Sequence, residues 1–576
     1  MTTAPGHHLH HHHQHLLFLL LLLLLFLPLS LSCEIGSTTE CDSLPFVPGH
    51  NLVGEGFDVV RMKTTGAFVV DTRTYMLGGE QGNCTVCRNR LLNRRQKLPV
   101  AAVDWRVKVR CRRALRAQIY ESSQAVLKEN ARSHSASWKI GLNLGGLHGF
   151  AVGGTHSESS RFAKSLSAKD KYSFSRHDFT CRYYTFRLRA RPPLTKDFNQ
   201  AIRSLPVKYN STTLPSYRHF IAVYGTHFLR QVDLGGRVQS TTAVRTCQLA
   251  MTGLTIHDIS NCLSVEATAT IKGVTVSAAS NFCKARGKKL KKGRSFAATF
   301  SERITSILGG RGQEGDLLFA PGNKSSYDSW LKSLKTLPGV VSYSLTPLHM
   351  LLNRTKDPVK RESLRQAVSD HIRGSAVPVA CRSRCAVGRR VNSCACKCSG
   401  HRGIDANCCP TQPGLGGLSV VVERATGLWG DHFSKTDAYV KVFYGRRGSA
   451  TPVIWNNDFP RWNYGVSFGT VDLGRRNPLR FEVWDRDQRW NDDLLGKASL
   501  VPSQGQRVKK RFQMKHGSLY VSVSATCAPS LTGPFCGRYS PTPQAEAGGH
   551  YPNEQASGGH TWGRTSPKHT WSNALL

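Results

Sequence analysis

Residues 418 to about 525 form short runs in which apolar and polar positions alternate. The clearest runs cover residues 418–422, 438–443, 479–484 and 518–523. A period of two places every second side chain on the same face of a strand, and turn residues separate the runs. This pattern predicts an antiparallel β-sandwich.

Two earlier segments alternate in the same way over arms of roughly ten residues, the length of a tilted transmembrane strand. The first segment has the apolar positions Ile140, Leu142, Leu144, Phe150, Val152, Tyr172, Phe174, Tyr184, Phe186 and Leu188. The second has Leu263, Val265, Ala267, Ala269, Ile271, Phe296, Ala298, Phe300, Ile304 and Leu308. Half-buried strands of a soluble sheet would show the same alternation, so the pattern alone leaves both interpretations open.

The apolar run at residues 16–27 is too short to span a bilayer and suits the core of a secretory signal peptide. Small residues follow at Ser30 and Ser32, and a His-rich stretch precedes the run. We expect residues 1–32 to be a signal peptide with a His-rich leader. No other run is apolar for long enough to be a transmembrane helix.

Composition divides the rest of the chain into four parts. Residues 33–375 form one large unit without a linker-like stretch, and a cysteine-rich module follows at 376–413. The module ends in a turn-rich linker, Pro410 to Gly417. The predicted sandwich occupies 414–527, and the Gly-, Pro-, Ser- and His-rich residues 528–576 are predicted to be a disordered tail.

The eighteen cysteines of a secreted chain indicate disulfides rather than metal thiolates. Seven of them lie between 381 and 409, where the chain is too short for a hydrophobic core and is similar to an epidermal-growth-factor-like module. Because seven is odd, one of these cysteines must pair outside the module. One scheme pairs Cys33, Cys41, Cys84 and Cys87 among themselves, and joins Cys111 to Cys181, Cys262 to Cys283, Cys527 to Cys536, and Cys247 to Cys408 or Cys409.

The formal net charge is +41. Such a charge indicates an acidic partner, and a secreted chain favours anionic lipid or an acidic glycosaminoglycan over nucleic acid. Four Asn-x-Ser/Thr sequons are candidate glycosylation sites and belong on the surface, namely Asn83, Asn210, Asn323 and Asn353.

Aspartates cluster in two loops of the predicted sandwich. The first loop carries Asp431 and Asp437, and the second carries Asp485, Asp487 and Asp493. Calcium takes six to eight oxygen ligands, and carboxylates so close together would repel one another without a cation. The spacing predicts a Ca²⁺ site and resembles a C2-type domain, which binds phospholipid in the presence of calcium. Further candidate ligands are Gly430, Asn491 and Asp492.

The same two loops carry the large aromatic residues Trp429, Phe433 and Trp490. Aromatic rings favour the headgroup region of a bilayer, so we predict that these three residues anchor the loops in a membrane. Trp455, Trp462 and Trp484 lie on or beside predicted strands, where we expect them to pack internally.

The pentapeptide Tyr224-Gly225-Thr226-His227-Phe228, followed by Gly235-Gly236, resembles the signature of the membrane-attack-complex/perforin (MACPF) family. The resemblance implies an α+β fold with a bent central antiparallel sheet and flanking helical clusters. It also implies that the two alternating segments are helical in the soluble form and extend as β-hairpins on insertion. Gly235, Gly236, Gly309 and Gly310 are then candidate hinges, because glycine accepts backbone angles that other residues do not.

The resemblance implies a secreted cytolytic protein that is not an enzyme. It would be stored in secretory granules, dock on a phospholipid membrane through calcium, and assemble into a homo-oligomeric ring or arc. An assembly is required because a lone hairpin leaves unpaired backbone groups in lipid. The alternative is a calcium-dependent lipid-binding or adhesion protein that keeps the fold without lysing membranes.

Overall fold

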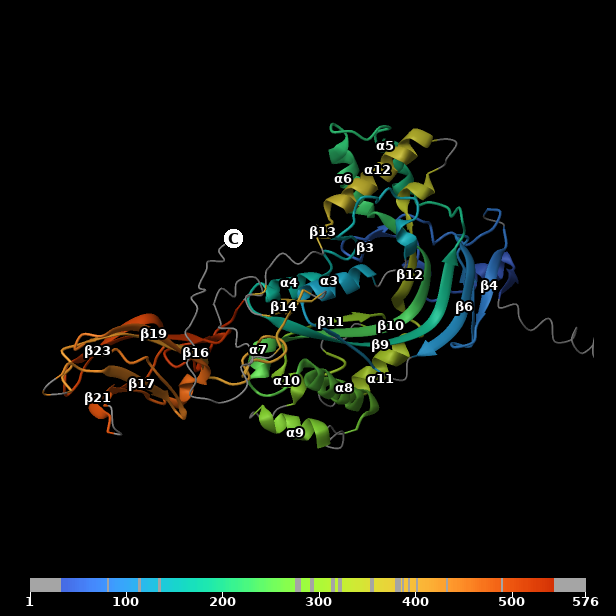
Figure 1. Cartoon of the computed structure of the whole chain (residues 1–576). Coiled ribbons are helices and arrows are strands. Elements are labelled where there is room, and N and C mark those ends of the chain that lie inside the picture. The colour runs from blue at the N-terminus through green and yellow to red at the C-terminus, as the bar shows by residue number, and fades with distance from the viewer. Residues whose placement is uncertain are drawn as a thin grey trace, which may run out of the picture.

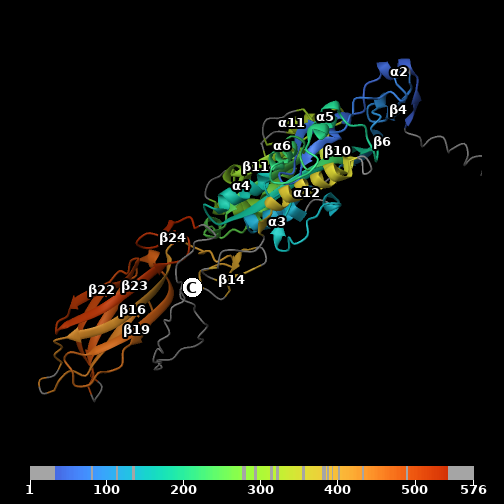
Figure 2. The same ribbon diagram turned by 90° about the horizontal axis from the view of Figure 1, so that it is seen from above.

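The computed structural model describes residues 33–542, apart from short gaps at 80–81, 112–114, 133–135, 275–280, 291–294, 312–315, 320–323, 353–356, 379–384, 386–387, 392–393, 400–401, 431, 433 and 488–490. Three parts follow one another along an elongated molecule (Figures 1 and 2). The large α+β domain occupies one end, a β-sandwich occupies the other, and the cysteine-rich module lies between them. Among the described residues, no helix has the length and apolar character needed to cross a membrane.

A central antiparallel sheet forms the large domain. Its strands run in the order β3-β2-β10-β9-β6, with β7 paired to β9 and both β11 and β12 paired to β10. The bounds are β2 (Glu55–Asp58), β3 (Lys63–Phe68), β6 (Ala102–Cys111), β7 (Arg116–Tyr120), β9 (Tyr172–Leu188), β10 (His227–Arg245), β11 (Arg303–Leu308) and β12 (Gly339–Pro347).

The two longest strands, β9 and β10, lie at the centre of the sheet, and most of their residues are buried. The expectation that the first alternating segment is helical is wrong for its second arm, because the positions from Tyr172 to Leu188 form β9 of the central sheet. A bulge between Leu234 and Gly235 bends β10, and at this point its edge passes from partner β12 to partner β11.

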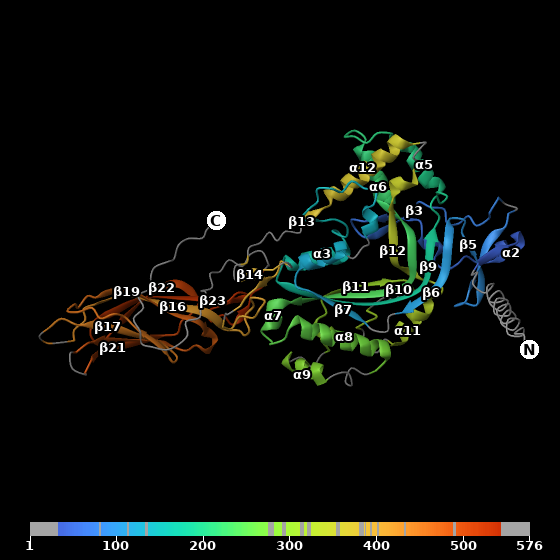
Figure 3. The same cartoon turned by 45° about the vertical axis from the view of Figure 1, so that its right-hand side comes forward.

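Helices cover the sheet on both faces (Figures 1 and 3). On one face lie α3 (Ser123–Arg132) and α4 (Glu158–Ser167), and on the other lie α8 (Ile256–Lys272), α9 (Asn281–Lys289), α10 (Phe296–Thr299) and α11 (Lys324–Ser333). A cap at one end of the sheet consists of α5 (Lys196–Ser204), α6 (Leu214–Tyr224) and α12 (Pro358–Gly374). The shorter helices are α2 (Thr38–Ser43), α7 (Thr246–Ala250), η2 (His50–Leu52), η3 (Ala136–Lys139) and η5 (Leu348–Leu351).

The second alternating segment is largely helical in this structure. Ile259, Cys262, Leu263, Glu266 and Ala267 face the core from α8, a spacing of three to four residues. The Thr255 side chain and Asp258 cap this helix reciprocally, and Gly273 ends it in a left-handed conformation. Capping and core contacts therefore override a period-two pattern that alone would suggest a strand.

Disulfides join neighbouring elements of the large domain. Cys33–Cys87 and Cys41–Cys84 hold the small sheet β1 (Cys33–Gly36), β4 (Cys84–Asn89) and β5 (Arg94–Leu98). Cys111–Cys181 and Cys262–Cys283 are also formed, as in the scheme expected from the sequence.

The cysteine-rich module contains Cys385–Cys396 and Cys398–Cys408, and Cys409 bonds to Cys247 of the large domain. Of the two alternatives for Cys247, the structure therefore has Cys409. The module strands are β14 (Arg389–Arg390) and β15 (Cys396–Lys397), and β13 (Val377–Pro378) pairs with β8 (Phe150–Ala151) of the large domain.

The C-terminal part is the expected sandwich of two four-stranded antiparallel sheets. One has the order β19-β16-β23-β22 and the other β18-β17-β20-β21. The bounds are β16 (Leu415–Thr426), β17 (Ala438–Tyr444), β18 (Arg447–Ala450), β19 (Arg461–Asp472), η6 (Leu473–Arg475), β20 (Leu479–Asp485), β21 (Asp493–Leu500), β22 (Gly505–Gln513) and β23 (Ser518–Cys527).

The prediction of a disordered tail from 528 is wrong for the residues up to 542. Strands β24 (Leu531–Thr532) and β25 (Arg538–Tyr539) pair, and the Cys527–Cys536 disulfide closes their loop. The Tyr539 hydroxyl and the Thr542 N–H both donate to the buried Asp170 carboxylate of the large domain, at 2.5 and 3.0 Å. These contacts, together with the burial of Leu531 and Cys536 in the sandwich core, hold the segment in place in spite of its polar composition. The rest of the tail, like residues 1–32, lies outside the described residues.

Candidate calcium and membrane site

Three loops meet at the end of the sandwich that lies farthest from the large domain (Figure 1). They connect β16 to β17, β18 to β19, and β20 to β21. The strand pairing β17–β20 fixes two of them, because Ala438 lies opposite Asp485 and Asp437 immediately precedes Ala438. The predicted aspartates of both loops are thus brought to one end of the sandwich.

Asp485 is buried beneath the first loop, with 1% of its surface exposed. Its Oδ1 accepts a hydrogen bond from the Asp437 N–H at 2.6 Å, and the Arg486 N–H donates to the Asp437 carbonyl at 3.0 Å. A Cβ at Gly430 would lie 1.7 Å from Oδ2 of Asp485. Glycine at this position therefore lets the first loop pass directly over the carboxylate.

The Asp437 carboxylate receives the backbone N–H of Asn456 from the middle loop at 2.6 Å. Asn456 has a left-handed φ of 51°, a conformation that asparagine tolerates, and its Oδ1 accepts from the Lys435 N–H at 3.3 Å. Nearby, Asp458 accepts from both the N–H and the hydroxyl of Thr436, each at 3.0 Å. The middle loop thus positions the first loop.

Asp492 accepts a hydrogen bond from the Tyr439 hydroxyl. Burial raises the pKa of Tyr439, and the bond to this carboxylate raises it further. Asp487 is half-buried, whereas Asn491 and Asp493 are exposed. Their role as ligands remains a prediction, as does that of Asp492. Asp431, Phe433 and Trp490 lie outside the described residues.

The donor set suits a hard cation. Carboxylate oxygens from Asp437 and Asp485 lie on two loops that are joined by backbone hydrogen bonds, and further carboxylates follow within the second loop. Within the described ranges, which omit Asp431, no group of three or more acidic, His or Cys side chains is close enough to hold a metal. The residues present therefore fit calcium in chemistry, and a complete ligand set stays a prediction.

The aromatic residues at this end only partly follow the sequence prediction. Trp429 is half exposed, and its ring lies 5.1 Å from that of His432 and 5.3 Å from that of His516. The expectation that Trp455 packs internally is wrong, because 60% of its surface is exposed. Trp462 is partly buried against the core of the sandwich. Trp484 lies half-buried on the outer face of its sheet beneath the Lys441 ammonium, 4.3 Å from the ring centroid.

The signature pentapeptide forms a buried joint between α6 and β10. Gly225 ends α6 with a φ of 78°, and a Cβ there would lie 2.6 Å from the backbone of Phe57. His227 is completely buried, lies 2.8 Å from the Trp138 carbonyl through Nε2, and has a pKa lowered by burial to about 4. Thr226 accepts from the Val59 N–H and donates to the Phe57 carbonyl. These residues hold the end of the sheet together.

The candidate hinge glycines gather where β10, β11 and β12 meet. A Cβ on Gly309 would lie 2.3 Å from the Gly235 carbonyl and 2.5 Å from the Gly339 nitrogen. Trp330 of α11 donates through Nε1 to the Gly309 carbonyl at 2.9 Å and packs against Gly236. The absence of side chains thus allows close backbone contact at the bend, and a hinge function for these glycines remains a prediction.

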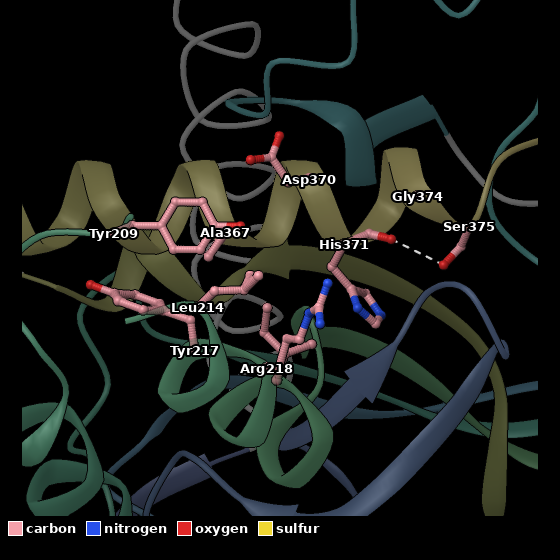
Figure 4. A pocket seen from close by; sticks show the side chains of 10 residues that line it. Tyr209, Leu214, Tyr217, Arg218, Ala367, Asp370, His371, Gly374 and Ser375 are labelled. Atoms are coloured by element: carbon pink, nitrogen blue, oxygen red, sulfur yellow. Dashed lines mark hydrogen bonds between the residues drawn. The ribbon is translucent and has the colours of Figure 1, made fainter. Parts of the chain in front are cut away.

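A cavity of about 250 Å³ lies in the helical cap, between α6 and α12 (Figure 4). Tyr209, Tyr217, Arg218 and His371 are among the residues that line it. Burial lowers the pKa of His371, and the positive charges of Arg61 and Arg218 act in the same direction. The cavity belongs to the large domain and lies far from the aspartate loops. Of the four sequons, Asn83 and Asn210 are exposed, and the other two are outside the described residues.

Comparison with known proteins matches the two main parts of the chain separately. Residues 46–378 match the MAC/Perforin domain family, and residues 416–515 match the C2 domain family. Perforin-1 of Rattus norvegicus is 40% identical over 89% of this chain and 94% of its own length. Perforin-1 of Homo sapiens is 40% identical over 88% and 93%, respectively. The complement component C8 alpha chain of Oryctolagus cuniculus is 27% identical over 46% of this chain and 49% of its own length.

Proposed function

This chain belongs to the MAC/perforin family, and from that premise we propose how it forms pores. It is a perforin-like pore-forming protein, not an enzyme. In the proposed mechanism, calcium-dependent docking through the C2 domain precedes assembly with further copies and the insertion of two hairpins per subunit.

The proposal rests on one observation: the strands on either side of each helical segment are paired with each other. The chain between β7 and β9 forms α3 and α4, and yet β7 and β9 are paired, Tyr120 opposite Phe174. The chain between β10 and β11 forms α7 to α10, and yet β10 and β11 are paired, Thr242 opposite Arg303. Each segment is therefore inserted between two antiparallel neighbours, and each can extend as a hairpin without exchanging strand partners.

Continuing the two registers predicts where the hairpins turn. The β7–β9 register leads to a turn centred on Leu147, next to Gly146, and the β10–β11 register leads to a turn at Lys272-Gly273. Gly146 and Gly273 already have positive φ angles. The arms on either side exceed the roughly ten residues that a transmembrane strand requires.

The soluble form holds the second segment by polar contacts that can be replaced. Glu266 of α8 is buried, and its carboxylate accepts the N–H groups of Phe296 and Ala297 at 2.7 and 2.8 Å, so it caps α10 from a distance. Burial raises the pKa of Glu266. The segment buries Ile259 and Leu263 in the core, but it is otherwise rich in Ala, Ser and Thr, whose small side chains bury little apolar surface, and we propose that it is metastable.

Docking would use Asp437 and Asp485 together with the other predicted ligands Gly430, Asp431, Asp487, Asn491, Asp492 and Asp493. Bound calcium would neutralise these loops and supply charge that phosphate oxygens of lipid can contact. Asp485 and Gly430 orient the first loop, and Trp429 faces the solvent beside it. Protons compete with calcium for carboxylates, so storage in an acidic secretory granule, with an acidic glycosaminoglycan as partner of the +41 chain, would keep the protein inactive.

Phosphatidylcholine vesicles with entrapped dye test the proposal. We expect sedimentation with the vesicles and dye release in calcium, and neither of them with a chelator. Calcium-dependent sedimentation without dye release would favour a non-lytic lipid-binding protein. Dye release in the chelator would contradict docking through calcium.

A further inference from the structure

The loop between β18 and β19 exposes two aromatic side chains that the candidate site does not include. Trp455 and Phe459 leave 60% and 62% of their surfaces in water. Removing a large aromatic side chain from water is favourable, so two such rings on one loop are an unused source of binding energy.

This loop is held in place by its neighbours. Ile454 and Ala438 exchange two backbone hydrogen bonds of 3.0 and 2.9 Å, next to Asp437. On the other side of the loop, the Leu428 N–H donates to the Asp458 carbonyl at 3.0 Å. Both aromatic residues are thus exposed although hydrogen bonds hold their loop in place.

The same hydrogen bonds place the loop beside the predicted calcium ligands. The Asn456 N–H, adjacent to Trp455, donates to the Asp437 carboxylate. Leu428, adjacent to the half-exposed Trp429, contacts the residue before Phe459. The three exposed rings therefore belong to neighbouring loops at one end of the sandwich.

We propose that Trp455 and Phe459 insert into the phospholipid interface and form an aromatic membrane contact on the middle loop, alongside Trp429. The inference rests on the proposed docking function and extends it to a third loop. A lipid surface fits better than a protein partner for two reasons. The rings continue the face that calcium would bring to lipid, and the residues between them include the amides Asn456 and Asn457, which suit the hydrated headgroup region.

Ala substitutions in the full chain test this contact by sedimentation with phosphatidylcholine vesicles in calcium. We expect Trp455→Ala and Phe459→Ala each to weaken partitioning several-fold, and the double variant to weaken it about tenfold or more. Val501→Ala is the matched control. Val501 is 45% exposed but follows Leu500 at the opposite end of β21 from Asp493, so partitioning should be unchanged.

Two further measurements separate lipid insertion from loop support. Calcium affinity without lipid should stay within about twofold of the wild type in both single variants, since neither ring contributes an oxygen ligand. Bromine-labelled phosphatidylcholine should quench less of the tryptophan fluorescence in Trp455→Phe than in the wild type. A loss of calcium affinity would instead assign the rings to loop structure.

Unchanged partitioning of the double variant would overturn the inference while calcium-dependent docking stood. Normal partitioning with failed ring assembly would make this face a protein contact and would also overturn it. If wild-type partitioning were itself independent of calcium, the proposed docking function would fail separately.

Discussion

The segment between β10 and β11 and the loop end of the C2 domain are both proposed to contact the membrane, but their structures are stabilised in opposite ways. The segment is helical, although its flanking strands already pair. Besides its apolar core residues, α8 contacts the sheet through the polar side chains Ser260 and Ser264, and its Glu266 contacts α10. The loops are fixed by backbone hydrogen bonds to Asp437 and Asp485. A docking surface must have its binding conformation before it meets the membrane, whereas an inserting segment must be able to change from its soluble conformation to another.

The largest effect on membrane docking should come from removing two carboxylates from the loops of the C2 domain. We expect Asp437→Asn with Asp485→Asn to lower calcium-dependent vesicle binding about a thousandfold, because affinity follows the charge of the ligand set. Vesicle sedimentation over a calcium titration measures this. The single variant Asp472→Asn, at a partly buried position in the same domain but outside the loops, should bind vesicles normally. Calcium-dependent binding by the double variant would mean that the site lies elsewhere.

A side chain at the bend should destabilise the large domain. Gly309→Ala combines a φ of 75° with a Cβ 2.3 Å from the Gly235 carbonyl, so we expect a loss of about 2–3 kcal/mol, seen as a thermal midpoint several degrees lower. Gly445→Ala is the control, since Gly445 has a φ of 59° in open space. If Gly309→Ala and Gly445→Ala were equally stable, the close contact between Gly309 and Gly235 would not restrict the side chain at position 309.

Acidic pH should destabilise the contact between α8 and β9. His177 on β9 lies 3.1 Å from the Ser260 carbonyl and from the Ser264 hydroxyl, and burial lowers its pKa from 6.5 to about 4. The stabilisation by neutral His177 is complete above pH 6.5 and is lost as the pH falls toward 4, at about 1.4 kcal/mol per pH unit at most. Arg303 also lowers this pKa, and Asp316 opposes it.

Thermal unfolding between pH 7 and pH 5 checks this prediction. The midpoint should fall less steeply in His177→Gln than in the wild type. His148→Gln, a change at an exposed histidine, should keep the wild-type slope. If the midpoint of His177→Gln fell with pH as steeply as that of the wild type, protonation of His177 would not affect the contact between α8 and β9.

The sequence predicted those features that depend on local spacing or composition. The sandwich, the aspartate loops and the pairing of most cysteines need only a short pattern or a small number of partners. The helical state of residues 263–271 came from family resemblance, because alternation fits a strand, and the buried spacing of α8 is clear only with Glu266 and Cys262 in place. Nothing local distinguishes Trp455 as exposed, since its environment depends on hydrogen bonds to a loop about twenty residues away.

The disordered-tail prediction shows the same limit. Residues 528–542 are ordered by contacts with distant parts of the chain: Leu531 and Cys536 are buried in the sandwich core, and the Asp170 carboxylate accepts hydrogen bonds from Tyr539 and Thr542. Contacts between residues far apart in the chain produce no local sequence pattern from which they could be predicted.

An engineered tether tests most directly whether the α8 segment must leave the sheet to make a pore. The Ser175 and Ser260 hydroxyls, on β9 and α8, lie 2.9 Å apart, so Ser175→Cys with Ser260→Cys should cross-link the helix to the sheet. The matched control is Ser240→Cys with Thr305→Cys, which are register partners of β10 and β11, also with their hydroxyls 2.9 Å apart, and stay paired in the proposed hairpin.

We predict that the oxidised Ser175–Ser260 tether allows calcium-dependent vesicle binding but no dye release, and that mild reduction restores release. The oxidised Ser240–Thr305 control should release dye throughout. Dye release from the verified, oxidised Ser175–Ser260 form would contradict the account, because the pore would then form with α8 still on the sheet.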